Sequence, residues 1–122
     1  MKPGKTGLTR VIFACKYSMQ GLKAAWIHEA AFRQELALLL ILTPITFFLP
    51  VSALEQLALI GCLFLVLITE LVNSAIEAIV DKTGSEWHEL SGRAKDIGSA
   101  AVFVALVFAG LTWAMILLPK LF

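Results

Sequence analysis

Four polar side chains in an otherwise apolar stretch are the residues best suited to chemistry. The segment ITELVNSAIEAIVD, residues 68–81, contains Glu70, Asn73, Glu77 and Asp81. The fourteen residues that precede Glu70 carry no charge. Because a carboxylate in hydrocarbon is costly unless it is neutralised, paired or hydrated, acids in such a segment usually mark a functional site. The segment therefore predicts a membrane helix that carries a site.

The spacing of these residues assigns the two glutamates to different roles. Glu70 and Glu77 are seven residues apart, so they share a helical face to within about 20° and lie roughly 10 Å apart along the axis. Asn73 lies between them on that face. Two carboxylates at this separation do not bind the same metal ion. They must act at different depths.

The shallower acid is suited to a metal and the deeper one to proton transfer. Glu77, near the cytoplasmic boundary, predicts a Mg²⁺ site whose second acid is Glu29. Glu70 is placed to act as a base toward a molecule dissolved in the membrane. A structural alternative remains open, in which these acids form ion pairs between helices with Lys82, Arg33 or Lys95.

Composition indicates the environment of these residues. Of 122 residues, 59% are hydrophobic and 16% charged, which is typical of an integral membrane protein. The net charge of +1 is too small for a nucleic-acid partner. Three stretches have the length needed to cross a bilayer, about 20 residues. They are residues 36–54, 56–80 and 97–119.

Residues 6–34 are predicted to form an amphipathic helix on the membrane surface. Seven apolar residues fall within an arc of about 100° on such a helix: Leu8, Val11, Ile12, Cys15, Met19, Leu22 and Trp26. The alternative is a core helix of a soluble bundle. Nine of the ten Lys and Arg residues lie before the first span or between the second and third, which places the N-terminus in the cytoplasm.

The cytoplasmic segment 81–99 could hold phosphate oxygens. Gly84 is expected to end the second membrane helix and Ser91 to cap the next one. Lys95 and Asp96 then open the third span, where helix-end amides and an amine suit an anion. An ordinary solvated loop is the alternative.

Three longer motifs resemble a known family. EAAFRQE (29–35), ELVNSAIEAIVD (70–81) and GSEWHELSGRAKDIGSAAV (84–102) are similar to the bacterial integral-membrane diacylglycerol kinases, and the resemblance extends over the whole chain, 1–122, as a single domain. It implies an all-α membrane protein, with an N-terminal surface helix and three transmembrane helices, that assembles as a homotrimer with shared active sites. It also implies phosphorylation of diacylglycerol to phosphatidic acid with Mg²⁺ and ATP, in the bacterial cytoplasmic (inner) membrane.

The resemblance also implies roles for individual residues. Glu70 would be the catalytic base, assisted by Asn73 and Lys95, and Glu29 and Glu77 would bind the metal. ATP contacts would come from Arg10, Tyr17, Glu29, Glu77, Glu86, Trp87, His88, Lys95 and Asp96. Lipid contacts would come from Arg10, Ala14, Cys15, Lys16, Tyr17, Ser18, Met19, Lys23, Ala24, Ala25, Trp26, Ala31, Phe32, Arg33, Gln34, Glu35, Glu70, Ser99 and Trp113.

The surface helix departs from the family pattern. Lys16, Met19 and Gln20 stand where members commonly carry Gly, Trp and Lys. A related kinase that acts on a polyprenol, such as undecaprenol, is therefore one alternative. A small proton-coupled membrane transporter, which also carries an intramembrane glutamate, is another.

Overall fold

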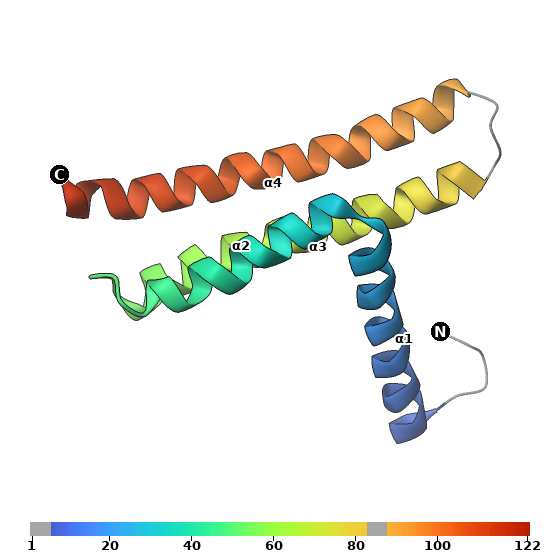
Figure 1. Ribbon diagram of the computed structural model, residues 1–122, viewed down its shortest axis with the longest axis horizontal. Coiled ribbons are helices and arrows are strands. Elements are labelled where there is room, and N and C mark those ends of the chain that lie inside the picture. The colour runs from blue at the N-terminus through green and yellow to red at the C-terminus, as the bar shows by residue number, and fades with distance from the viewer. Residues whose placement is uncertain (1–5, 83–87) are drawn as a thin grey trace.

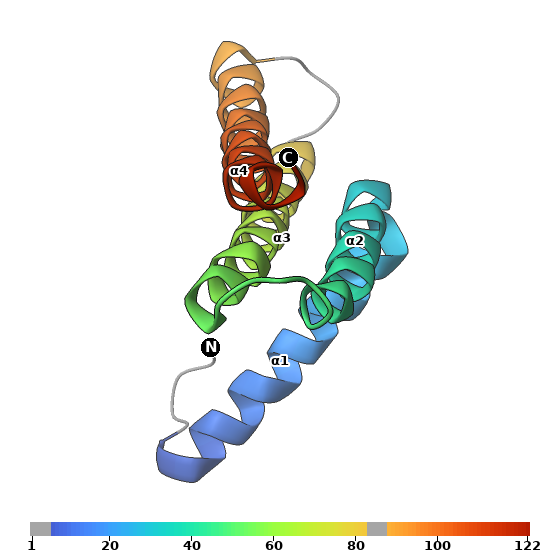
Figure 2. The same ribbon diagram turned by 90° about the vertical axis from the view of Figure 1, so that its left-hand side faces the viewer.

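The computed structural model describes residues 6–82 and 88–122, and the regular structure in these ranges is entirely helical. The helices are α1 (Gly7–His28), α2 (Ala30–Thr46), α3 (Ala53–Lys82) and α4 (Glu89–Leu121). Helices α2, α3 and α4 run side by side, whereas α1 leaves them at a steep angle (Figures 1 and 2). The expected all-α fold is confirmed for the described residues.

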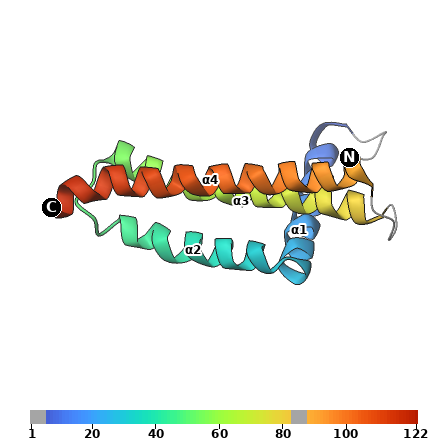
Figure 3. The ribbon, with the colours of Figure 1, turned by 90° about the horizontal axis from the view of Figure 1, so that it is seen from above.

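Helices α3 and α4 pack along most of their length (Figure 3). Their buried residues recur every three or four positions, as in coiled-coil packing: Leu59, Cys62, Val66, Glu70 and Asn73 on α3, and Gly98, Val102, Ala105 and Ala109 on α4. The α4 stripe consists of small residues, which let two helix backbones approach closely. The side chain of Asn73 on α3 therefore lies directly against the α4 backbone at Gly98.

Helix α2 ends earlier than the sequence predicts. The first span was expected to cover residues 36–54, but helical geometry stops at Thr46. Pro50 has no N–H and disfavours helix at the residue before it, so the chain turns here instead of continuing. The hydroxyl of Thr46, which is buried, accepts a hydrogen bond from Gln56 Nε2 at 3.1 Å and so ties this turn to α3.

The chain breaks its helix at Glu29, where the sequence predicts one continuous surface helix over residues 6–34. Glu29 has extended backbone angles, φ −121° and ψ 105°, and it separates α1 from α2. Nη1 of Arg33 donates to the carbonyl oxygens of Trp26 at 2.6 Å and Ile27 at 3.4 Å. A guanidinium on the last carbonyls of a helix is a favourable C-terminal cap. Arg33 thereby stabilises the bend between α1 and α2.

Helix α4 begins well before the expected start of the third span at residue 97. Its N-cap residue is His88, and Ser91 lies inside the helix, so the prediction that Ser91 caps it is wrong. Lys95 and Asp96 also lie inside α4, so the free amides expected at this point are not there. The predicted stop at Gly84 falls outside the described residues. The polar residues 89–96 extend the helix beyond its apolar part.

Two of these helices, α3 and α4, are long and apolar enough to cross a membrane. With 17 residues, α2 is about 26 Å long, slightly less than the hydrocarbon thickness of about 30 Å. Large apolar side chains remain exposed on the helices, among them Phe103 at 66% and Val104 at 65%. Exposed apolar surface of this kind suits contact with lipid or with further copies of the chain.

Candidate active site

Three glutamates open onto one cavity of about 540 Å³ between the start of α2, the middle of α3 and α4. They are Glu29, Glu70 and Glu77, and Asn73 and Ser99 share the same cavity. The structure thus brings together the predicted metal pair, the predicted base and the asparagine between them. The spacing argument made from α3 alone correctly grouped its three members.

Glu70 is the most deeply buried of these acids, with an exposed fraction of 5%. Its Oε2 accepts a hydrogen bond from Ser74 Oγ at 3.2 Å. Its other neighbours are acids, since the charges of Glu29 and Glu77 both act on Glu70. The Glu70 carboxylate is therefore held by a hydroxyl and surrounded by negative charge.

Glu35 adds a fourth carboxyl to this group. It lies beside Glu70, and no donor among the described residues reaches its buried Oε2. The buried end of the site thus holds two neighbouring acids, Glu35 on α2 and Glu70 on α3.

Asn73 connects the buried part of the site to its mouth. Its Nδ2 donates to Glu77 Oε1 at 3.0 Å, and its side chain is 9% exposed. Glu77 lies closer to the end of α3 and is only partly buried. The amide thus orients a carboxylate that remains accessible near the C-terminal end of α3.

The alternative in which the acids serve as structural ion pairs is supported only for Asp81. Lys95 Nζ lies 3.1 Å from Asp81 Oδ1, whereas Arg33 is used to cap α1. Across residues 6–82 and 88–122, the ion pairs involve Glu55, Asp81 and Glu89 rather than the three glutamates of the cavity. The cavity glutamates are thus acids without a basic partner in the described chain.

The donor set fits a hard divalent cation. The described residues contain no group of three or more metal-ligating side chains, so one chain offers at most the two carboxylates of Glu29 and Glu77. Mg²⁺ is commonly held by one or two carboxylates, with water and substrate phosphates as the remaining ligands. The residues fit Mg²⁺ bound together with a nucleotide.

The predicted nucleotide residues are spread over the chain. Arg10 and Tyr17 lie on α1, which packs on α2 and projects away from the α3–α4 pair (Figure 1). His88 and Lys95 lie near the start of α4, at the same end of the bundle as α1 but on another helix (Figures 1 and 3). One chain does not bring these residues together. Glu86 and Trp87 fall outside the described residues.

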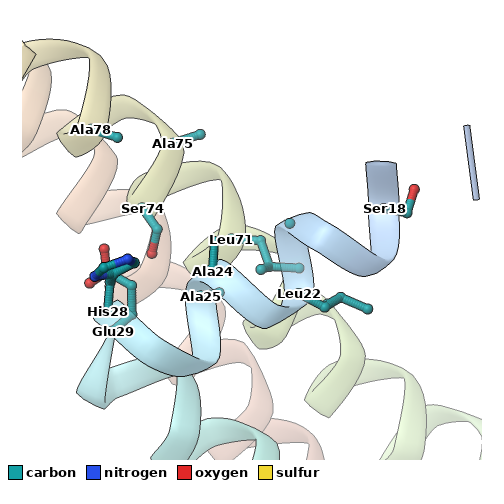
Figure 4. Close-up of a pocket in the computed structure, with 11 residues that line it drawn as sticks. Ser18, Leu22, Ala24, Ala25, His28, Glu29, Leu71, Ser74, Ala75 and Ala78 are labelled. Carbon is teal, nitrogen blue, oxygen red and sulfur yellow. The ribbon is translucent and has the colours of Figure 1, made fainter. Parts of the chain in front are cut away.

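The predicted lipid contacts divide among two cavities and the outer surface. A cavity of about 590 Å³ separates α1 from α3, and Figure 4 shows residues of the two helices lining it. Three predicted lipid residues border it, Ser18, Ala24 and Ala25, and the metal candidate Glu29 lies beside them. Its walls are mostly apolar, which suits an acyl chain.

A second, apolar cavity of about 240 Å³ lies between α2, α3 and α4 and has Glu35 and Trp113 on its wall. Nε1 of Trp113 donates to the carbonyl of Leu59 at 3.1 Å, which fixes the indole. Phe32, only 2% exposed, packs in the core instead of facing lipid. Ala31, Glu70 and Ser99 line the cavity of the glutamates. The remaining predicted lipid residues border none of these three cavities: Arg10, Ala14, Cys15, Lys16, Tyr17, Met19, Lys23, Trp26, Arg33 and Gln34.

Sequence reasoning missed Ser74 as part of the site. Its position four residues after Glu70 places it on the same helical face, so this spacing could have identified it. The contact between Glu35 and Glu70 joins two different helices. No periodicity within a single helix predicts such a contact.

Two helices of membrane-spanning length with a cluster of unpaired acids beside a cavity define a membrane-bound catalyst. The family model for "Prokaryotic diacylglycerol kinase" matches residues 16–117. Diacylglycerol kinase of Escherichia coli K12 is 54% identical over 117 residues, 96% of each chain. The Haemophilus influenzae and Pseudomonas aeruginosa proteins of the same name are 54% and 52% identical, over 92% and 94% of this chain and 95% and 94% of their own. The chain belongs to the prokaryotic diacylglycerol kinase family and is a kinase.

Proposed function

We propose that this kinase transfers the γ-phosphoryl group of ATP to the free hydroxyl of diacylglycerol and produces phosphatidic acid and ADP. The observation that carries the proposal is the cavity in which buried Glu70 lies beside the more accessible Glu77 and Glu29. A lipid hydroxyl can reach the first from the bilayer, and a nucleotide can reach the others from the cytoplasm. Family membership favours this kinase over a proton-coupled transporter.

In the proposed reaction, Glu70 accepts the proton of the lipid hydroxyl. The hydroxyl oxygen forms a bond to the γ-phosphorus while the bond from that phosphorus to the β–γ bridging oxygen breaks, and ADP leaves. Ser74 donates a hydrogen bond to one oxygen of Glu70 at 3.2 Å and so orients the carboxylate. Positioning and electrostatic stabilisation supply most of the rate enhancement in phosphoryl transfer, and a general base adds to them.

Glu29 and Glu77 are proposed to hold Mg²⁺, with Asn73 orienting Glu77 through its 3.0 Å hydrogen bond. When bound, Mg²⁺ supplies neutralisation of the phosphate charge that develops during transfer. Lys95 lies one helix away, on α4, where its amine pairs with Asp81. We assign Lys95 to the nucleotide phosphates and Asp96 to another part of the nucleotide.

A homotrimer is proposed because the residues assigned to the nucleotide do not meet within one chain. Arg10 and Tyr17 project on α1 away from the carboxylates of the same chain. Neighbouring copies in the cytoplasmic membrane of the bacterium, each with its N-terminus in the cytoplasm, would supply them to one another. The exposed apolar faces of α3 and α4 provide surface for that assembly.

Transfer of radiolabelled phosphate from ATP to a short-chain diacylglycerol in detergent tests the proposed function. Product should form only with Mg²⁺, and the Glu70→Gln variant should form it about 10²–10⁴-fold more slowly. Undecaprenol, offered in parallel, tests the polyprenol alternative. Labelling of undecaprenol with none of diacylglycerol would overturn the proposal.

A further inference from the structure

Gly98 lies in the interior of α4, where the backbone conformation does not require a glycine. Gly98 is buried and lies ten residues after the helix N-cap, and the glycine with a positive φ among the described residues is Gly7. In a helix interior glycine is less favourable than alanine because it has more conformational freedom to lose. Its presence at position 98 therefore calls for a packing reason.

The space beside Gly98 is occupied by the asparagine of the active site. A Cβ at position 98 would meet Oδ1 of Asn73, would lie 3.3 Å from Asn73 Cγ and would lie 3.5 Å from Ile76 Cδ1. The amide oxygen of Asn73 thus lies where a side chain would start. No N–H or O–H donor among the described residues reaches this oxygen.

This contact determines which way the asparagine points. The other end of the same amide, Nδ2, donates to Glu77 Oε1 at 3.0 Å. Reversing the amide would set its oxygen against the carboxylate, which repels it. A Cα–H group, unlike a larger side chain, lets the oxygen lie directly on the helix backbone and contributes a weak C–H···O contact.

We propose that Gly98 is a positioning residue for the metal site. Because it has no side chain, Gly98 lets the amide of Asn73 pack on α4, where the amide holds Glu77 in place. This inference rests on the proposed function, in which Glu77 binds Mg²⁺. A side chain at position 98 displaces Asn73 and removes the hydrogen bond that orients the metal ligand. Loss of a residue that orients a metal ligand typically costs about 10–100-fold in metal affinity or activity.

The test compares Gly98→Ala with Gly61→Ala in the purified detergent-solubilised protein. Gly61 lies in the apolar part of α3, and a Cβ there meets nothing within 4 Å. Gly98→Ala should raise the apparent KM for Mg²⁺ by about 10–100-fold, and the KM for lipid should not change. Gly61→Ala should change neither. An unchanged Mg²⁺ dependence of Gly98→Ala overturns the proposal.

A second measurement reports metal binding without turnover. Mn²⁺ is titrated in the presence of a non-hydrolysable ATP analogue and followed by electron paramagnetic resonance, and Gly98→Ala should weaken its binding. Glu77→Gln is titrated alongside. If Glu77→Gln binds Mn²⁺ weakly and Gly98→Ala binds it normally, only the role of Gly98 is overturned. If Glu77→Gln binds Mn²⁺ normally, the proposed metal site itself is overturned.

Combining the variant with Asn73→Ala shows whether Gly98 acts through Asn73. Removing the asparagine side chain also removes the clash, so Asn73→Ala/Gly98→Ala should bind Mn²⁺ no more weakly than Asn73→Ala alone. Additive losses would show an independent role and overturn the proposal. If Gly98→Ala alone fails to fold, recovery of folding in the double variant supports the contact, and failure to recover overturns it.

Discussion

Glu70→Gln separates a catalytic role of the buried glutamate from a structural one. Glutamine keeps the length of the side chain, and its oxygen can still accept the 3.2 Å hydrogen bond from Ser74, but it does not accept the proton of a lipid hydroxyl. General-base catalysis supplies about 10²–10⁴-fold, which corresponds to about 3–5 kcal/mol of activation free energy. The turnover number should fall by that factor.

The same variant should not lose stability. Glu70 is 5% exposed, and its charged neighbours Glu29 and Glu77 are acids. Replacing the carboxylate with a neutral amide removes this repulsion without leaving a basic residue unpaired. Breaking a buried ion pair would instead destabilise the protein by about 3–5 kcal/mol.

Three measurements on Glu70→Gln decide between these roles. Turnover is measured by phosphate transfer to a short-chain diacylglycerol, nucleotide affinity by titration, and stability by thermal unfolding in the same detergent. We expect loss of turnover with nucleotide affinity and unfolding temperature maintained. A clear fall in unfolding temperature together with normal turnover would remove Glu70 from the active site.

Further perturbations test the other acids of the cavity. Glu77→Gln should weaken binding of Mg²⁺ and ATP by about 10–100-fold, as measured by titration. The control Glu89→Gln, on an exposed side chain at the start of α4, should have no effect. Equal affinities in the two variants would refute the assignment of Glu77 to the metal. Mixing inactive Glu29→Gln and Glu70→Gln subunits should restore activity if sites are shared between copies, and absence of recovery at every mixing ratio would contradict shared sites. Glu35→Gln keeps a polar side chain that can donate an N–H to Glu70, so its unfolding temperature should match that of the parent. Glu35→Leu should unfold at a lower temperature, and equal stability of the two variants would argue against a contact between Glu35 and Glu70.

The arrangement within a single helix was predictable from the sequence. The face that carries Glu70, Asn73 and Glu77 follows from 3.6 residues per turn, and the structure places all three on one cavity. The apolar stretch before them likewise predicted the position of α3. Such patterns are local, and a sequence displays them directly.

Features that depend on contacts between helices were not predictable in this way. The bend at Glu29 contains no proline or glycine and depends on Arg33 reaching the carbonyls of Trp26 and Ile27. Hydropathy located the apolar part of α4 but not its start, because the polar residues from Glu89 onward are compatible with helix. The contact of Asn73 with Gly98 likewise depends on how α3 and α4 are aligned along their axes, which the sequence of either helix does not show.

Glu29 connects α1 to α2 and is also a candidate metal ligand. Its extended backbone is the point about which α1 can pivot relative to α2, and its carboxylate borders both the α1–α3 cavity and the cavity of the glutamates. Any change in the angle between α1 and α2 would therefore move the carboxylate that is proposed to bind the metal.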